Sequence, residues 1–86
     1  MELQLKIKNA EGLHARPAGI LAKKASEFQS TIQISVNNQT KSAKSIMALM
    51  SLSLKKDQEF KLILDGPDAE QASIAISELV NNEFKS

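Results

Sequence analysis

The stretch that decides the fold is Thr31-Ile32-Gln33-Ile34-Ser35-Val36-Asn37-Asn38, because it defines one strand and the chain reversal that follows it. Apolar and polar side chains alternate as far as Val36, and this period of two predicts a strand with one buried face. Asn37 and Asn38 tolerate positive φ, so they predict a tight hairpin turn into a short strand near residues 40–43. Because the strands of a hairpin run antiparallel, the sheet is expected to be antiparallel.

Two other segments alternate in the same way, residues 3–7 and residues 60–64. Every predicted strand therefore has one apolar and one polar face. This pattern is typical of an antiparallel sheet that is covered on a single side. Gly66 and Pro67 are expected to end the last strand.

Three helices are predicted between and after these strands. Apolar residues recur at helical spacing over about 17–28, and a shorter helix is predicted over about 45–52. The last helix follows Asp68, which with Gln71 three residues later resembles a capping box. The order β-α-β-β-α-β-α predicts an α+β fold for residues 1–86: a single two-layer domain with a four-stranded antiparallel sheet and three helices on one face.

The composition excludes several classes of function. Cysteine is absent and histidine occurs once, which excludes disulfides and thiol catalysis, so no metal and no cofactor is expected. A net charge of +1 and the lack of Trp and Tyr argue against nucleic acid as the main partner. No apolar run reaches the roughly 18 residues of a membrane span and no signal-peptide pattern opens the sequence, so we expect a cytoplasmic protein without membrane insertion.

The only histidine, His14, stands two residues before Arg16 and three before Pro17. Because proline is favoured at the first position of a helix, His14 is expected to lie beside unpaired backbone N–H groups and the positive end of a helix dipole. Arg16 adds a guanidinium suited to phosphate oxygens. A nucleophilic ring nitrogen beside an anion site favours a histidine that accepts and surrenders a phosphoryl group. The alternative is an ordinary surface histidine near a helix start.

Gly-Leu-His-Ala-Arg-Pro-Ala at 12–18 resembles the active-site signature of the histidine-containing phosphocarrier family, HPr, of the bacterial phosphoenolpyruvate-dependent phosphotransferase system. The likeness covers essentially the whole chain and implies an open-faced β-sandwich. It also implies that His14 accepts a phosphoryl group from enzyme I and donates it to enzyme IIA in sugar uptake. In this interpretation Arg16 stabilises the phosphoryl charge and Pro17 starts the helix.

A second block, residues 44–52, resembles the regulatory serine segment of the same family. The resemblance implies that Ser45 is a phosphorylation site for HPr kinase/phosphorylase and that a transcriptional regulator is a further partner. A phosphate at a helix N-terminus is compatible with the fold. The plain alternative is that Ser45 serves only as the N-cap of the helix. Ala48 and Ser53 depart from the family, which often has glycine at these positions.

A partner surface is predicted on the short middle helix, whose apolar residues leave almost no polar side. A helix on a one-layer surface buries only a stripe, so Met47 and Met50 are expected to be partly exposed, and Ile20 to extend the patch. Basic side chains are expected to form a face around His14 that steers acidic partners toward it. The chain is expected to be a monomer and its complexes with these partners to be transient. The predicted contact residues are Ile20, Lys23, Lys24, Ile46, Met47 and Met50, with Arg16, Lys41 and Lys44 adding to the basic face. The alternatives are that the apolar residues are all core and that the charges are simply solvated.

Two other functions compete with a phosphocarrier. One is a purely regulatory binding module that acts through Ser45, with His14 incidental. The other is a small enzyme with His14 as general base, which is disfavoured because His14 has no evident acid–base partner. The sequence does not separate a sugar-transport branch from a nitrogen-related branch of the phosphotransferase system.

Overall fold

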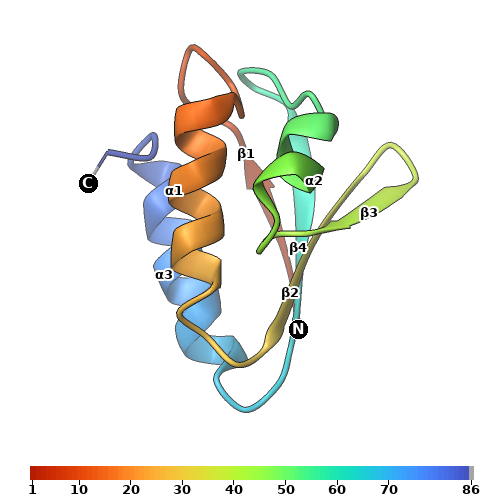
Figure 1. Ribbon diagram of the computed structural model, residues 1–86, viewed down its shortest axis with the longest axis vertical. Coiled ribbons are helices and arrows are strands. Elements are labelled where there is room, and N and C mark those ends of the chain that lie inside the picture. The colour runs from red at the N-terminus through yellow and green to blue at the C-terminus, as the bar shows by residue number, and fades with distance from the viewer. Residues whose placement is uncertain (86) are drawn as a thin grey trace.

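A computed structural model describes residues 1–85 as one sheet covered by helices (Figure 1). The elements follow the predicted order β-α-β-β-α-β-α. The strands are β1 (Glu2–Lys6), β2 (Thr31–Val36), β3 (Gln39–Ser42) and β4 (Glu59–Asp65). The helices are α1 (Ala15–Ala25), α2 (Ile46–Ser51) and α3 (Ala69–Asn81). Among these residues no helix is long and apolar enough to cross a membrane.

The sheet has the strand order β1-β4-β2-β3, and every neighbouring pair is antiparallel. Leu62 of β4 is paired with Leu3 on one side and Ile34 on the other, so alternate residues form apolar rows across the strands. Asn37 and Asn38 have φ of 52° and 65°, which confirms the predicted tight turn. The strand after it runs over Gln39–Ser42, one residue earlier than expected.

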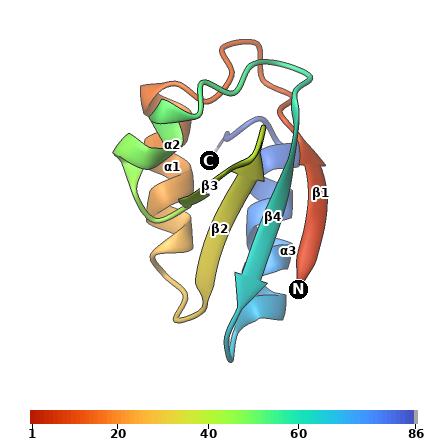
Figure 2. The ribbon, with the colours of Figure 1, turned by 90° about the vertical axis from the view of Figure 1, so that its right-hand side faces the viewer.

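The helices lie on one side of the sheet, and in Figure 2 α3 is seen behind β4 while α1 lies to the left of β2, behind β3. The core lies between these two layers and includes Ile34 and Leu62 of the sheet with Leu21 of α1 and Ile76 of α3, all of them fully buried. Burial of this apolar surface is the main stabilising contribution in a domain of this kind. The predicted α+β architecture is confirmed.

Helix α1 differs from the prediction at both ends. It begins at Ala15, so Pro17 is its third residue. Proline is tolerated there because the first-turn N–H groups have no partner within the helix. The helix ends at Ala25, and Phe28 lies in the turn that follows, with its N–H bonded to the Ala25 carbonyl at 3.2 Å. The predicted extension to residue 28 is wrong because the chain must reverse before β2.

Asp68 does not form the predicted capping box. Its carboxylate makes no cap bond to α3 and instead accepts hydrogen bonds from the backbone N–H groups of Gln29 and Ser30, each at 2.9 Å. The Ser30 hydroxyl donates to the same carboxylate. The bond from the Ser30 side chain, followed by that from Gln29, holds the pKa of Asp68 below its ordinary value. Asp68 thus ties the start of α3 to the turn between α1 and β2.

Candidate functional site

His14 is exposed at the N-terminal end of α1, where it is the N-cap residue. Its carbonyl oxygen accepts the first bond of the helix, from the Ala18 N–H at 2.8 Å, but its side chain caps nothing. Pro17 has no N–H, and the N–H groups of Ala15 and Arg16 have no backbone partner within residues 1–85. Two unpaired donors and the positive end of the helix dipole therefore lie beside the imidazole.

The loop before His14 is fixed against the segment that precedes β4. The Leu13 N–H donates to the Leu54 carbonyl at 2.9 Å. Gly12 has φ +69°, and a Cβ at this position would collide with the same carbonyl oxygen. Only glycine therefore allows the two backbones to approach this closely without strain.

A pocket of about 230 Å³ opens beside the imidazole. It combines apolar side chains with the exposed cation of Lys55, which makes no ion pair within residues 1–85. In the same part of the chain, no three His, Cys, Asp or Glu side chains are grouped closely enough to hold a metal ion. The pocket residues are Leu13, His14, Met50, Ser53, Leu54 and Lys55.

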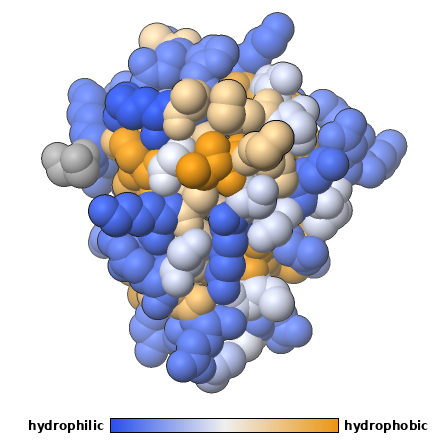
Figure 3. All heavy atoms as spheres, viewed as in Figure 1, coloured by the Kyte–Doolittle hydropathy of each residue, from blue (hydrophilic) through white to orange (hydrophobic). Residues whose placement is uncertain are grey.

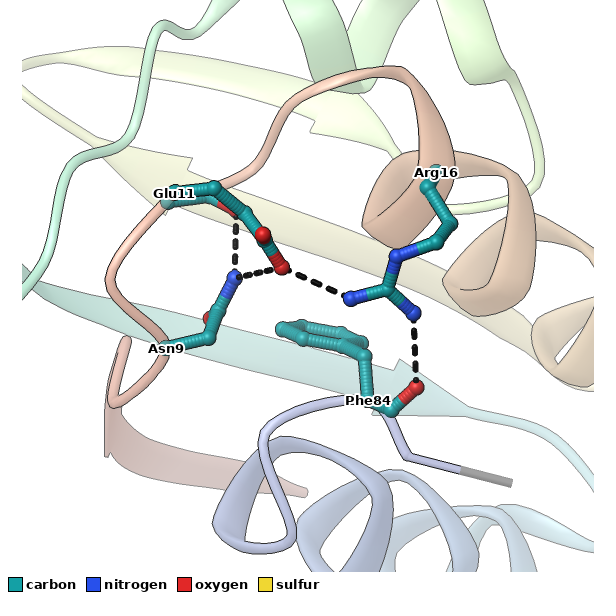
Figure 4. A network of polar contacts seen from close by, with 5 residues as sticks. Asn9, Glu11, Arg16 and Phe84 are labelled. Atoms are coloured by element: carbon teal, nitrogen blue, oxygen red, sulfur yellow. Dashed lines mark hydrogen bonds and ion pairs between the residues drawn. The ribbon is translucent and has the colours of Figure 1, made fainter.

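The Arg16 guanidinium is paired with groups other than His14 (Figure 4). Its Nη2 lies 2.7 Å from Oε1 of Glu11, and its Nη1 donates to the Phe84 carbonyl at 3.3 Å. Within residues 1–85 no hydrogen bond joins Arg16 to His14. Arg16 therefore lies within the first turn of α1 rather than just before the helix, and in this state its charge is directed at a carboxylate and a carbonyl.

Glu11 is held by a second donor, the side-chain amide of Asn9. The Asn9 Nδ2 donates to Glu11 Oε1 at 3.3 Å and to the Gly12 carbonyl at 2.7 Å. The bond from Arg16, followed by the bond from Asn9, holds the pKa of Glu11 below its ordinary value. Glu11 is thus an anion near the histidine, and it is already engaged with the cation expected to serve that histidine.

Sequence reasoning missed Asn9, Glu11, Lys55 and Phe84 as neighbours of the site. Glu11 carried a signal, because a carboxylate a few residues before an arginine across a glycine turn is within reach of an ion pair. Lys55 and Phe84 carried none, since only the tertiary fold brings them to α1. Phe84 reaches α1 through two left-handed residues, Glu83 at φ 58° and Phe84 itself at φ 60°.

Helix α2 exposes the apolar side chains that were expected to form a partner surface. Met47 is 83% exposed, Ile46 46% and Met50 43%, whereas Leu49 is fully buried. The prediction that the methionines are partly exposed is confirmed, and the alternative that all the apolar residues of this helix are core is wrong. Figure 3 shows apolar side chains gathered on the face that carries α1 and α2, surrounded by hydrophilic ones. Ile20 is half-buried and packs against the core.

Ser45 is the N-cap of α2, as predicted. Its Oγ accepts a hydrogen bond from the Ala48 N–H at 3.2 Å. The adjacent Lys44 is not a free cation of the face around His14, because its Nζ donates to the Phe28 carbonyl at 2.8 Å, beyond the far end of α1. Lys23 and Lys24 lie in the last turn of α1, roughly 14 Å along the axis from His14.

The cations of the expected basic face are therefore dispersed rather than gathered at the histidine: Lys23 and Lys24 lie on α1, Lys41 on β3, and Lys44 just before α2. Lys24 is further restrained, because its Nζ lies 3.4 Å from Oε1 of Glu27. Lys23 and Lys24 instead line a shallow groove with Ile20 and Glu27. Lys55, from the loop before β4, lines the pocket beside the imidazole and makes no ion pair within the described chain.

Comparison with known proteins decides the family. A family model described as the PTS HPr component phosphorylation site matches residues 1–82. The chain belongs to the HPr family. It is 48% identical over 67 residues to the phosphocarrier protein HPr of Mycoplasma capricolum, a match that covers 78% of this chain and 75% of that one.

Two further similar proteins extend this result. A crystal structure of HPr from Thermoanaerobacter tengcongensis superposes with a TM-score of 0.94 at 40% identity, covering 98% of this chain and 94% of that one. A multiphosphoryl transfer protein of Vibrio cholerae is 38% identical over 79 residues, which cover 88% of this chain but only 20% of that longer protein. As an HPr-family member, the chain is a phosphocarrier of the phosphotransferase system.

Proposed function

We propose that this HPr-family chain carries the phosphoryl group on His14, accepting it from enzyme I and donating it to enzyme IIA during sugar uptake in the cytoplasm. The observation that carries the proposal is an exposed sole histidine at a helix start with two unpaired N–H groups beside it. No second catalytic group is required, because phosphoryl transfer depends mainly on positioning and on stabilisation of charge.

The transfer is an in-line exchange between two imidazoles. The lone pair of a His14 ring nitrogen forms a bond to phosphorus while the bond from phosphorus to the donor nitrogen breaks, and those electrons return to the donor ring. The N–H groups at the start of α1 are positioned to stabilise the added negative charge. Pro17 supports this arrangement from within the first turn of α1, where its lack of an N–H leaves no further donor unpaired.

Arg16 supplies further charge stabilisation in this proposal. Its side chain is 56% exposed, so it has the freedom to leave its resting partners when a phosphoryl group arrives. A guanidinium is suited to this role because it can bond two phosphate oxygens at once.

The exposed side of α2 is the proposed docking surface for both partners. Ile46, Met47 and Met50 supply apolar anchors, and Ile20 with Lys23 and Lys24 forms the neighbouring surface of α1. Each buried anchor contributes about 1.5–3 kcal/mol, against an association cost of at least about 4 kcal/mol. A few anchors therefore give transient complexes, as a shuttle requires. We propose a monomer as the working form; a related HPr from Thermoanaerobacter tengcongensis has been crystallised as a dimer.

Ser45 is proposed as a regulatory phosphorylation site for an HPr kinase/phosphorylase, with a transcriptional regulator as the partner that recognises the modified form. Its support is position, because the hydroxyl caps the helix that carries the exposed methionines. A phosphate there would add about 1.5 to 2 negative charges beside the docking surface.

The test is incubation with phosphoenolpyruvate and a cognate enzyme I. One acid-labile phosphoryl group is expected per chain, and its position is mapped by mass spectrometry under alkaline conditions. Ser45→Ala is the matched control and should be labelled like the wild type, whereas His14→Ala should take no acid-labile label. Acid-labile labelling of the His14→Ala protein would refute the assignment.

A further inference from the structure

The resting partner of Arg16 points to a role for Glu11. We infer that Glu11 is a positioning residue: it holds Arg16 away from His14 in the unphosphorylated protein and competes with the phosphoryl group for the guanidinium, which keeps phospho-His14 a good donor. The inference rests on the proposed function of His14. It assigns to Glu11 control over how readily the phosphoryl group is passed on.

The position of the Glu11 carboxylate is fixed by a hydrogen bond within its own loop, from the side chain of Asn9. Asn9 is 97% buried, with 3% of its surface exposed, and its Nδ2 bonds both Glu11 Oε1 and the Gly12 carbonyl. Both of these partners are acceptors, so the Asn9 amide must present its nitrogen to them. The Gly12 N–H closes the same turn on the Asn9 carbonyl at 3.1 Å. Figure 4 shows the result, with Glu11 facing the guanidinium across the loop.

The strength of the Glu11–Arg16 pair suits a competition. The side chains are 47% and 56% exposed, and ion pairs in such positions are weak because water screens them. A phosphoryl group on His14 carries more charge than one carboxylate and offers three acceptor oxygens. It can therefore draw Arg16 from Glu11, but only by breaking an existing pair.

Phosphorylation then leaves two anions near one another. Glu11 loses its cationic partner and keeps only the neutral Asn9 amide, while His14 gains negative charge, and like charges at close range oppose each other. Both effects raise the free energy of the phosphorylated state relative to a protein without the carboxylate. A carrier benefits from this, because a group held too firmly by its carrier is not passed on.

Glu11→Gln tests the inference, since it removes the charge and keeps an oxygen of similar position. The measurement is the equilibrium constant for phosphoryl exchange between phospho-enzyme I and this chain. We expect Glu11→Gln to shift the equilibrium about two- to fivefold toward the phosphorylated chain, the range of a weak exposed ion pair. The matched control is Glu2→Gln, because Glu2 pairs with Lys61 on the sheet, 3.4 Å away, and should leave the equilibrium unchanged.

A double-mutant cycle with Arg16→Ala separates competition from simple repulsion. If Glu11 acts through Arg16, the effect of Glu11→Gln must shrink when Arg16 is absent. An undiminished effect in the Arg16→Ala background would overturn the inference, as would an unchanged or reversed equilibrium in the single variant. Failure of the wild-type chain to be labelled on His14 would refute the proposed function as well, so the two failures are distinct.

Discussion

The N-terminal ends of α1 and α2 differ in whether a side chain of the cap residue bonds the free N–H groups of the first turn. At α2 the Ser45 hydroxyl accepts the Ala48 N–H, so the helix start is closed by its own cap. At α1 the cap residue is His14, whose side chain bonds none of the free N–H groups. A serine cap stabilises a helix by about 1 kcal/mol, and α1 lacks that contribution. The comparison shows that an open helix start leaves its donors available to an arriving anion.

His14→Ser breaks the comparison most severely, because it offers α1 the kind of cap that α2 has. The acid-labile label should be lost completely, since a hydroxyl cannot form a phosphoramidate. Stability should rise by about 0.5–1 kcal/mol relative to His14→Ala. Thermal unfolding of both variants and labelling with enzyme I check the two expectations. If the serine variant melts no higher than the alanine variant, the start of α1 is not open in the way described.

Met47→Glu addresses the other side of the comparison, the exposed face of α2. Loss of one apolar anchor should weaken association with enzyme I about 10- to 100-fold, with little change in melting temperature because Met47 is mostly exposed. Ile74→Glu is the matched control, since Ile74 is an exposed apolar residue of α3. Titration calorimetry gives both affinities. Equal losses in the two variants would mean that the face of α2 is not the docking surface.

Ser45→Asp is expected to have the smallest effect on phosphoryl transfer. It tests what a negative charge does at the start of α2, which the Ser45 hydroxyl otherwise caps. The domain should stay folded and gain a few tenths of a kcal/mol, because a negative group is favourable at a helix N-terminus. Its phosphorylation by enzyme I should slow several-fold at low salt through weaker docking, and recover as salt screens the charge.

Ser45→Ala is the control for that experiment. It loses the cap, at a cost of about 1 kcal/mol, but carries no charge, so its transfer rate should match the wild type. A Ser45→Asp protein that is phosphorylated at the wild-type rate in low salt would rule out charge at Ser45 as a regulator of docking.

Local patterns were enough to predict the elements of this fold. Strand alternation around Ile32 and Ile34, and two consecutive asparagines, specify a hairpin because they act through neighbouring residues. The cap at Ser45 was predicted for the same reason. The start of α1 was misplaced by two residues because proline is acceptable throughout a first turn, so it does not define where the turn begins.

Side-chain partners could not be predicted in the same way. Asp68 had the spacing of a capping box, but Gln29 and Ser30 offer its carboxylate better donors from a loop that the sequence does not place nearby. Arg16 was expected to serve His14. Its ion pair with Glu11 lies within the local sequence, but its bond to the Phe84 carbonyl emerges only from the tertiary fold. Charged side chains choose among several partners of similar energy, and the choice depends on the whole structure.

The bond between Arg16 and the Phe84 carbonyl also bears on how the protein is made. It joins residues 68 positions apart, and β1 pairs with β4 across a similar stretch of chain. Contacts of such sequence separation form late, because a long loop must close first. Nearly all of residues 1–86 must therefore leave the ribosome before Arg16 can bond the Phe84 carbonyl. During synthesis the residues around His14 are therefore made long before Phe84, which supplies one of the contacts of Arg16.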